Sequence, residues 1–142
     1  DISNLKSKLI LLIGPPRSGK SDLLRQLAAR RQVQVLNVGA VLGRELLTVP
    51  NTRRHLQAAD LLKGITDDVA ENGLLLMDNI ELLFGRTLHV SPLDLLKRHA
   101  QGRRVVSVWP GELRENRLSY AATGHPEYQD YGIDGLVPFE IN

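Results

Sequence analysis

The sequence contains no cysteine among its 142 residues. This absence excludes disulfide bonds, thiolate catalysis, iron–sulfur clusters and cysteine-ligated zinc, and it is typical of a reducing compartment. Aromatic residues make up only 4% of the chain, with a single Trp, so single-stranded bases would find few side chains to stack on. No apolar run approaches the ~20 residues of a membrane helix, and the first residues lack the pattern of a signal peptide. We therefore expect a protein that does not enter a membrane.

The composition is that of an ordinary globular domain. Hydrophobic residues account for 42% of the chain and charged residues for 24%, which excludes wholesale disorder and fibrous repeats. The length fits one domain and buries enough surface to fold without covalent staples. We expect residues 1–142 to form a single domain.

Charge is divided unevenly along the chain, although its formal total is only +2. Residues 1–111 carry 16 basic and 10 acidic side chains, whereas residues 112–142 carry 2 and 6. Thirteen of the 18 basic residues are Arg, whose planar guanidinium suits phosphates and carboxylates. This pattern suggests a polyanionic or acidic partner, although a solvated mixed surface would look the same.

Short apolar runs alternate with longer helical patterns, which predicts a three-layer α/β fold with a mostly parallel five-stranded sheet. The expected strands are residues 9–13, 33–38, 74–77, 105–109 and 136–141, the last at an edge because it contains Pro138. The expected helices are residues 18–31 and 41–47, a long helix from Asn51 or Thr52 to Asn72-Gly73, and one capped by Ser91 that runs to about Ala100. The segment from Glu112 to Gly135 has no clear pattern. We expect no helical lid, because the last strand ends near residue 141.

One motif carries most of the functional information. Residues 14–21 read GPPRSGKS, a full match to G-x-x-x-x-G-K-[ST], between an apolar strand and an amphipathic helix. Glycines allow the backbone to turn around a phosphate so that N–H groups and a helix N-terminus face it. In such a P-loop Lys20 contacts the β- and γ-phosphates of ATP and Ser21 binds Mg²⁺. The predicted nucleotide-binding residues are Gly14, Pro15, Pro16, Arg17, Ser18, Gly19, Lys20, Ser21 and Asp22.

A second motif follows the third strand. Asp78 ends the run Leu74 to Met77 and should emerge at the carboxyl edge of a parallel sheet, near the P-loop. A carboxylate there holds Mg²⁺ or its water, as the Walker B Asp does. We therefore expect Ser21 and Asp78 to bind Mg²⁺, and Lys20 and Asp78 to belong to the catalytic set.

The group that would activate water for hydrolysis is not evident. The position after Asp78, where efficient P-loop ATPases usually carry Glu, is occupied by Asn79. Glu81 can reach back if the chain turns, or it can be an ordinary surface residue. Arg86, Arg114 and Arg117 follow strands and are candidates for arginine fingers that act on a neighbouring subunit. Ser107 is a weaker candidate, because a buried Ser bonded to backbone fits its position in a strand.

Other charged groups give weaker signals. The basic clusters are Arg53-Arg54-His55, Lys97-Arg98-His99 and Arg103-Arg104, which can bind phosphodiester backbones or simply cover helix surfaces. The four His residues are scattered without the spacing of metal ligands. We therefore expect no metal beyond nucleotide-bound Mg²⁺.

Beyond the P-loop, nearly the whole chain resembles the BrxF family, the small P-loop proteins of type-three bacteriophage-exclusion (BREX) systems. The resemblance is carried by Leu36-Asn37-Val38, Asp78-Asn79-Ile80-Glu81-Leu82-Leu83-Phe84, Trp109-Pro110-Gly111, Tyr120-Ala121 and Gly124-His125-Pro126-Glu127-Tyr128. It implies a cytoplasmic component of bacterial anti-phage defence that works beside a DNA methyltransferase, an alkaline-phosphatase-like protein and a larger P-loop ATPase. It also implies that Asn79 is a property of the family.

The resemblance further implies the strand order 5-1-4-3-2 of the additional-strand ATPases, with residues 105–109 between the P-loop strand and the Asp78 strand. It suggests a nucleotide-dependent switch or weak ATPase. The resemblance leaves open whether the chain forms a homo-oligomer and whether it contacts DNA. The alternative is a small-molecule kinase of the nucleotide type, in which the first and third strands pair directly. A GTPase is not favoured, because the sequence lacks the Asn-Lys-x-Asp guanine motif.

Overall fold

The computed structural model describes residues 9–15, 17–70, 73–85, 88, 90–120, 129–133 and 135–141. Their centre is a five-stranded parallel sheet of β1 (Leu9–Ile13), β2 (Val35–Asn37), β3 (Leu74–Asp78), β4 (Arg104–Val108) and β8 (Leu136–Glu140). The strands lie in the order β2-β3-β4-β1-β8. The chain is thus an α/β protein whose sheet is parallel throughout, where the sequence predicted a mostly parallel one.

The register of the sheet places β4 between β1 and β3. Leu12 pairs with Val108, and Met77 pairs with Ser107 on the other side of β4. Asp78 is therefore level with Val108 and Leu12, two strand spacings from β1, or about 10 Å. The ends of β1 and β3 consequently lie at the same carboxyl edge.

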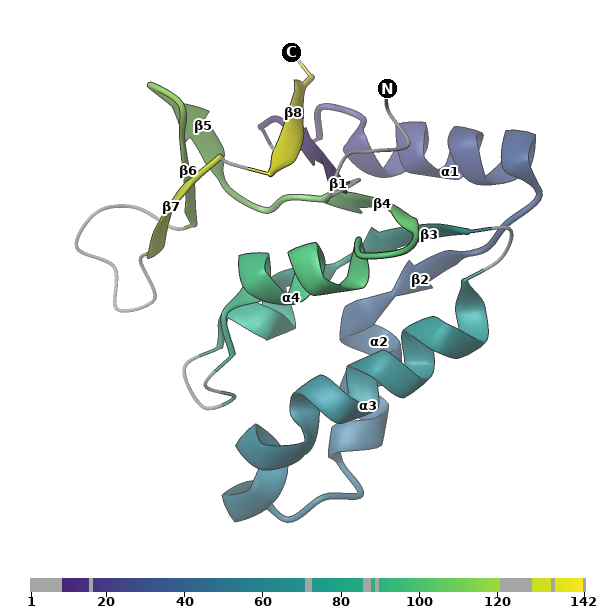
Figure 1. Cartoon of the computed structure of the whole chain (residues 1–142), viewed down its shortest axis with the longest axis vertical. Coiled ribbons are helices and arrows are strands. Elements are labelled where there is room, and N and C mark those ends of the chain that lie inside the picture. Colours follow the sequence, from purple (N-terminus) through teal and green to yellow (C-terminus); the bar gives the residue numbers. More distant parts are fainter. Residues whose placement is uncertain are drawn as a thin grey trace.

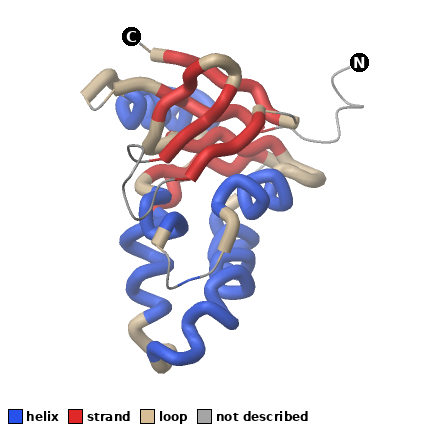
Figure 2. The backbone as a smooth tube through the Cα atoms, turned by 90° about the vertical axis from the view of Figure 1, so that its left-hand side faces the viewer, coloured by secondary structure: helices blue, strands red, loops and turns tan. Residues whose placement is uncertain are grey.

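The strands β1, β3 and β4 are largely apolar because both faces of the sheet are covered there, which is usual for parallel sheets, whereas the edge strand β8 exposes Val137 and Phe139. One face packs against α1 (Lys20–Arg31) through Leu24 and Ala28. The other packs against α2 (Val38–Leu46), α3 (Arg54–Val69) and α4 (Pro92–His99). Figure 1 shows α1 on one side of the strands and these three helices on the other. In the turned view of Figure 2, most of the helical tube lies below the strands.

Several element boundaries differ from the sequence prediction. Helix α1 begins at Lys20 and not at residue 18, because Gly19 has a left-handed backbone. Val38 belongs to α2 and not to the preceding strand, because the side chain of Asn37 accepts a hydrogen bond from the Ala40 N–H and so begins the helix there. The long helix is preceded by a 3₁₀ turn, η2 (Asn51–Arg53), and ends at Val69. Trp109 lies just beyond β4.

The segment that had no clear pattern contains all three strands of a second, antiparallel sheet. It consists of β5 (Glu112–Arg114), β6 (Arg117–Tyr120) and β7 (Gln129–Gly132) in that order. Glu115 and Asn116 connect β5 and β6 with positive φ angles of 51° and 63°, as a type I′ hairpin requires.

An aromatic cluster holds this second sheet to the main one. The Trp109 Nε1–H donates to the Ser119 carbonyl at 3.1 Å. The Trp109 ring meets Phe84 and Tyr131 edge-on, with centroids 5.2 and 5.6 Å away, and Tyr120 stacks on Phe84. Because Phe84 closes the turn η3 (Ile80–Phe84) after β3, the second sheet is tied to the carboxyl edge of the first.

Strand β8 is an edge strand, which confirms the prediction made from Pro138. The Ile141 N–H donates to the Ile13 carbonyl at 2.7 Å, so Phe139 and Ile141 turn their backbone groups toward β1. Pro138, one residue out of phase, turns its backbone to the outer side, where its missing N–H breaks no ladder bond. Among the described ranges, no helix combines the length and the apolar character of a membrane span.

Candidate functional site

The glycine-rich loop lies where β1 ends and α1 begins, at the carboxyl edge of the sheet. Its path is fixed by two left-handed residues, Arg17 with φ 64° and Gly19 with φ 97°. The Ser18 N–H donates to the Pro15 carbonyl at 3.1 Å and closes a tight turn between them. Pro16, which the sequence also assigned to this loop, lies outside the described residues.

Gly14 begins the loop in a space too small for a side chain. A Cβ atom on Gly14 would lie 2.5 Å from the Ile141 carbonyl oxygen and 2.6 Å from the Ser18 hydroxyl oxygen. The Ser18 hydroxyl is itself buried without a hydrogen-bond partner in the described part of the chain. An unsatisfied buried hydroxyl is costly, so this atom stands ready to bond a group brought into the loop.

The ammonium group of Lys20 is turned back over the loop. Its Nζ donates to the Gly14 carbonyl at 2.5 Å and lies 3.4 Å from the Pro15 carbonyl. Both acceptors belong to the turn that precedes the helix. Lys20 therefore holds its positive charge above the loop backbone and not in open solvent.

The first turn of α1 adds main-chain donors to this charge. The first bond of the helix ladder runs from the Leu23 N–H to the Gly19 carbonyl at 2.9 Å. The N–H groups of Lys20, Ser21 and Asp22 come earlier and lie outside the ladder. They carry the partial positive charge of the helix N-terminus, which favours a bound anion.

Six of the predicted residues and one that was missed line a cavity of about 360 Å³ at this loop. The predicted ones are Arg17, Ser18, Gly19, Lys20, Ser21 and Asp22. The missed one is Arg25, which forms an ion pair with Asp22 three residues earlier. The Asp22-x-x-Arg25 spacing on a helix was the signal that could have found it. Three cationic side chains thus surround one acidic one.

Asp78 ends β3 at the same edge, half-buried, but it does not line that cavity. Its Oδ1 accepts a hydrogen bond from the Asn79 N–H at 2.8 Å. Asn79 has a left-handed backbone, and its carbonyl accepts from the Gly39 N–H at 2.9 Å. The position after Asp78 therefore serves to connect β3 to the start of α2.

Glu81 is exposed in η3, two residues beyond Asn79, and it also does not line the cavity. Nothing in the described contacts brings Glu81 to Asp78 or Lys20, so its role as a base stays a prediction. Ser107 is fully buried, and its hydroxyl donates to the Val108 carbonyl at 3.1 Å. The backbone-bonded reading of Ser107 is confirmed.

The two candidate arginine fingers flank the hairpin turn of the second sheet, where Arg114 and Arg117 are paired. Arg114 is 82% exposed and forms an ion pair with Glu112 at 3.0 Å. Neither lines the cavity of its own chain. Arg86, the third candidate, lies outside the described residues.

The donors at the loop are of the kind that bind an anion such as phosphate. A triphosphate needs N–H donors, a cation and a backbone without bulky side chains. The first turn of α1, Lys20 and the two glycines Gly14 and Gly19 supply these features. Ser21 at the start of α1 and Asp78 at the end of β3 offer the oxygen atoms that Mg²⁺ prefers. Within the described ranges, no group of three His, Asp or Glu side chains gathers to form a metal site without the nucleotide. Comparison with models of known protein families and with curated proteins gives no match.

Proposed function

We propose that the chain binds Mg²⁺·ATP at the glycine-rich loop and acts as a nucleotide-dependent switch or slow ATPase. The observation that carries this proposal is the position of Lys20. Its ammonium lies over the Gly14 and Pro15 carbonyls, beside the free N–H groups that begin α1. An incoming phosphate would offer the Lys20 ammonium a negatively charged partner in place of two neutral carbonyls, so the attraction between opposite charges would add to the hydrogen bond.

The sheet supports this location independently. Helix α1 covers one face, while α2, α3 and α4 cover the other. The connections therefore change face between β1 and β4. In open α/β sheets, ligands bind at the carboxyl ends of the strands at such a switch point, and the loop begins there.

The residues at the site can serve the binding of ATP better than its hydrolysis. Bound Mg²⁺ would neutralise phosphate charge, with Ser21 and Asp78 as the ligands from this chain. The loop orients the phosphates, and Lys20 stabilises the negative charge that develops on the transferring group. Asn79 can hydrogen-bond water but cannot accept its proton. We therefore assign ATP binding with slow turnover to the isolated chain.

The strand register does not favour the kinase alternative. A kinase of the nucleotide type is expected to pair its first and third strands, whereas β1 pairs with β4 and β8 among the described strands. We further propose, from the family resemblance, that the chain works in the bacterial cytoplasm as part of a BREX-type defence system. Its partners would then be the methyltransferase, the phosphatase-like protein and the larger ATPase of that system.

Calorimetric titration of Mg²⁺·ATP into the wild-type chain and into Lys20→Ala tests the proposal. The variant should bind ATP more than about tenfold more weakly, which is ~1.4 kcal/mol or more. Arg44→Ala removes the same charge from the exposed side of α2 and should leave the affinity unchanged. Equal affinity of wild type and Lys20→Ala would overturn the assignment of the site.

A further inference from the structure

Positive side chains gather at the amino edge of the sheet, opposite the glycine-rich loop. Helices α1 and α4 each lead back to the start of a strand, so both end at this edge. Their last turns are basic, and two further Arg residues lead into β4. Together with a Lys of α3, these side chains form what we name the basic edge: Arg30, Arg31, Lys63, Lys97, Arg98, Arg103 and Arg104.

The basic edge extends over both faces of the sheet. Arg104 pairs with Leu74, which packs under α1, so the exposed side chain of Arg104 lies on the face where α1 ends. Arg103 and Arg98 lie on the other face, where both line a cavity together with Lys63. The start of β4 is two strands from β2, or about 10 Å. The cations therefore form an elongated positive surface and not one compact cluster.

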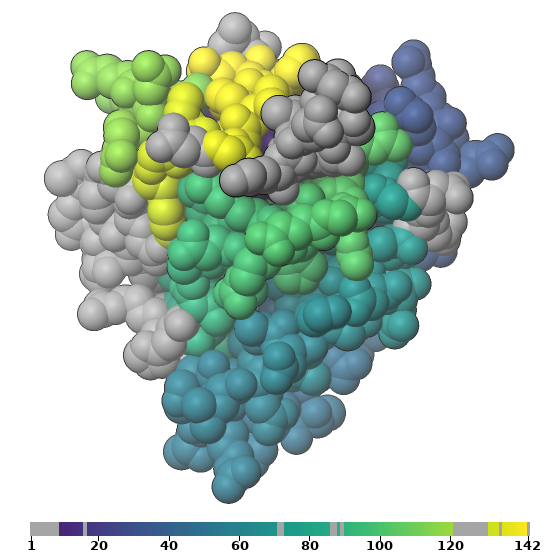
Figure 3. Space-filling view, viewed as in Figure 1, coloured from purple at the N-terminus to yellow at the C-terminus, as the bar shows by residue number. Residues whose placement is uncertain are grey.

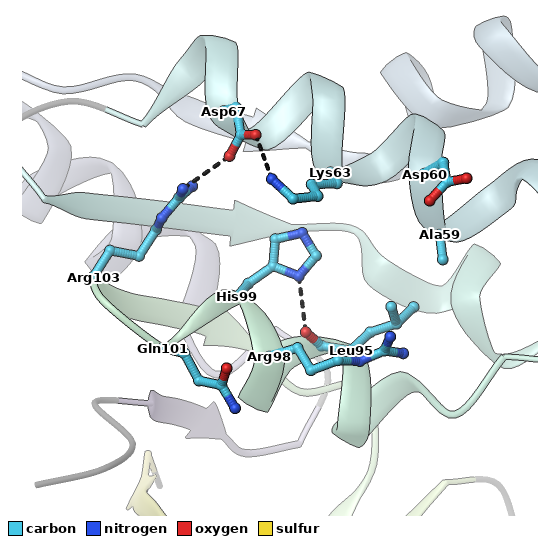
Figure 4. Close-up of a pocket in the computed structure, with 9 residues that line it drawn as sticks. All are labelled: Ala59, Asp60, Lys63, Asp67, Leu95, Arg98, His99, Gln101 and Arg103. Carbon is cyan, nitrogen blue, oxygen red and sulfur yellow. Dashed lines mark hydrogen bonds and ion pairs between the residues drawn. The ribbon is translucent and has the colours of Figure 1, made fainter.

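The cavity on the α3 side has a volume of about 370 Å³ (Figure 4). Asp67 holds the Lys63 Nζ and the Arg103 Nη2, each at 2.8 Å. Its hydrogen bonds with Lys63 and Arg103 lower the pKa of Asp67 to about 2. This carboxylate stays ionised at neutral pH and keeps the two cations oriented. Figure 3 shows the green surface of α4 adjoining the teal surface of α3.

The charge of this edge exceeds what the fold itself requires. Among the described carboxylates, Asp60 and Asp67 line the cavity with these cations, and Asp68 follows Asp67 in α3. Cations at a helix C-terminus offset its partial charge of about −0.5. The C-termini of α1, α3 and α4 together carry roughly −1.5, which offsets that much of the positive charge. About +2.5 remains uncompensated. His99 adds nothing to this charge, because burial lowers its pKa.

We infer that the basic edge binds the phosphodiester backbone of nucleic acid. Five of its seven cations are Arg, which bonds phosphate oxygens in pairs. A duplex presents one negative charge per about 1.7 Å of its axis, and a band of cations can follow such a row. The cavity is lined by no Phe, Tyr or Trp side chain, and Phe84, Trp109, Tyr120 and Tyr131 pack in their own cluster. Recognition is therefore of the backbone and not of the base sequence.

The inference is independent of nucleotide binding. The five residues of β1 separate the basic edge from the loop by about 17 Å. A nucleic acid at this edge therefore leaves Lys20 and Ser21 accessible. Lys20→Ala should bind DNA as the wild type does, so failure of one proposal leaves the other standing.

Fluorescence anisotropy with a labelled 30-base-pair duplex of arbitrary sequence tests the inference, at 50 and 200 mM salt. We expect the duplex to bind, and the logarithm of the association constant to fall with the logarithm of the salt concentration at a slope of about −4. Arg98→Gln/Arg104→Gln should weaken binding at 50 mM salt by about 10- to 100-fold and reduce the slope by about 2. Circular dichroism melting should show both proteins folded.

The matched control is Arg44→Gln/Arg53→Gln, which removes the same charge from exposed residues of α2 and η2. This variant should bind the duplex within about twofold of the wild type. Equal loss in both double variants would show a net-charge effect and overturn the inference. It is equally overturned if no binding occurs at 50 mM salt, or if poly-glutamate binds as tightly as the duplex, which would mark a site for an acidic protein.

Discussion

Gly14 and Ile141 approach so closely that the loop and the last strand are packed as one unit. The Ile141 carbonyl oxygen lies only 2.5 Å from the position that a Cβ atom on Gly14 would take. The same residue, Ile141, donates its N–H to the Ile13 carbonyl just before the loop. The start of the glycine-rich loop therefore rests on backbone contributed by the far end of the chain.

Gly14→Ala should destabilise the protein. The added methyl group meets backbone, which cannot rotate away, so we expect a cost of about 1–3 kcal/mol. The Tm should fall by roughly 2–4 °C per kcal/mol. Gly64→Ala is the matched control, because Gly64 lies in α3 with open space around its Cβ position. It should raise stability by about 0.5–1 kcal/mol, and a Gly14→Ala variant as stable as Gly64→Ala would contradict the packing described.

The isolated chain should hydrolyse ATP slowly, well below the usual ~1–10³ s⁻¹ of enzymes. Asn79 stands where a Glu carboxylate would act as the base. In other P-loop enzymes, an arginine finger from another subunit raises kcat by about 10³–10⁵-fold. Assembly of the chain with itself or with the proposed partner proteins should raise the rate. Arg114→Ala or Arg117→Ala should reduce that gain without weakening ATP binding. Phosphate release measured in each mixture checks this, and several turnovers per second by the chain alone would contradict it.

Glu81→Gln separates the two readings of Glu81. If Glu81 is a surface residue, as its exposure indicates, the variant should keep the turnover of the wild type within about twofold. Loss of the partner-stimulated rate, with ATP affinity unchanged, would identify Glu81 as the base. Asp78→Asn serves as the reference, because it should lower the rate in either case.

Stability should fall as the pH drops below about 6.5, partly through His99. Its Nδ1 bonds to the Leu95 carbonyl at 2.8 Å, and its Nε2 is buried without a partner in the described residues. Burial lowers the folded-state pKa from 6.5, so the unfolded chain takes up the proton first. The stabilisation is complete above 6.5 and decreases below it. Urea unfolding at pH 7.5 and 5.5 should show a smaller loss for His99→Gln, and an equal loss would contradict this role.

Trp109→Phe should cost about 1–3 kcal/mol, because the Ser119 carbonyl loses its buried donor. Chemical denaturation followed by circular dichroism measures the loss, since Trp109 is the only Trp in the chain. Phe139→Leu is the control. Its ring is 52% exposed on β8, and we expect a change within about 0.5 kcal/mol.

The main sheet could be predicted from the sequence because β1, β3 and β4 are largely buried on both faces. The runs at 9–13 and 74–77 are continuously apolar, and a turn or polar residue ends each one. The second sheet could not be predicted. Its strands are three or four residues long, and the hairpin turn uses Glu115-Asn116 where Asn-Gly is the usual signal.

In the candidate site, too, the residues of a local motif could be predicted, whereas residues brought together by the fold could not. A local motif predicted the loop residues, because their spacing alone sets the turn. Arg25 was missed because it lies beyond the motif, although its spacing of three residues from Asp22 on the predicted helix pointed to the ion pair. The basic edge was visible only as separate clusters, because Arg98, Arg103 and Lys63 meet through the packing of α3 on α4. The interaction of Trp109 with Ser119 likewise depends on a hairpin that the sequence did not reveal.

The outward-facing Pro138 limits how copies of this protein can associate. A strand that approached β8 would find no N–H donor at the centre of the free edge, so the ladder could not be extended there. The opposite edge is β2, with only three residues. Growth of the sheet from molecule to molecule is therefore blocked at both ends. Apart from the edges of the small second sheet, β5 and β7, assembly of this chain is left to side-chain surfaces, which can carry specificity where an open backbone edge cannot.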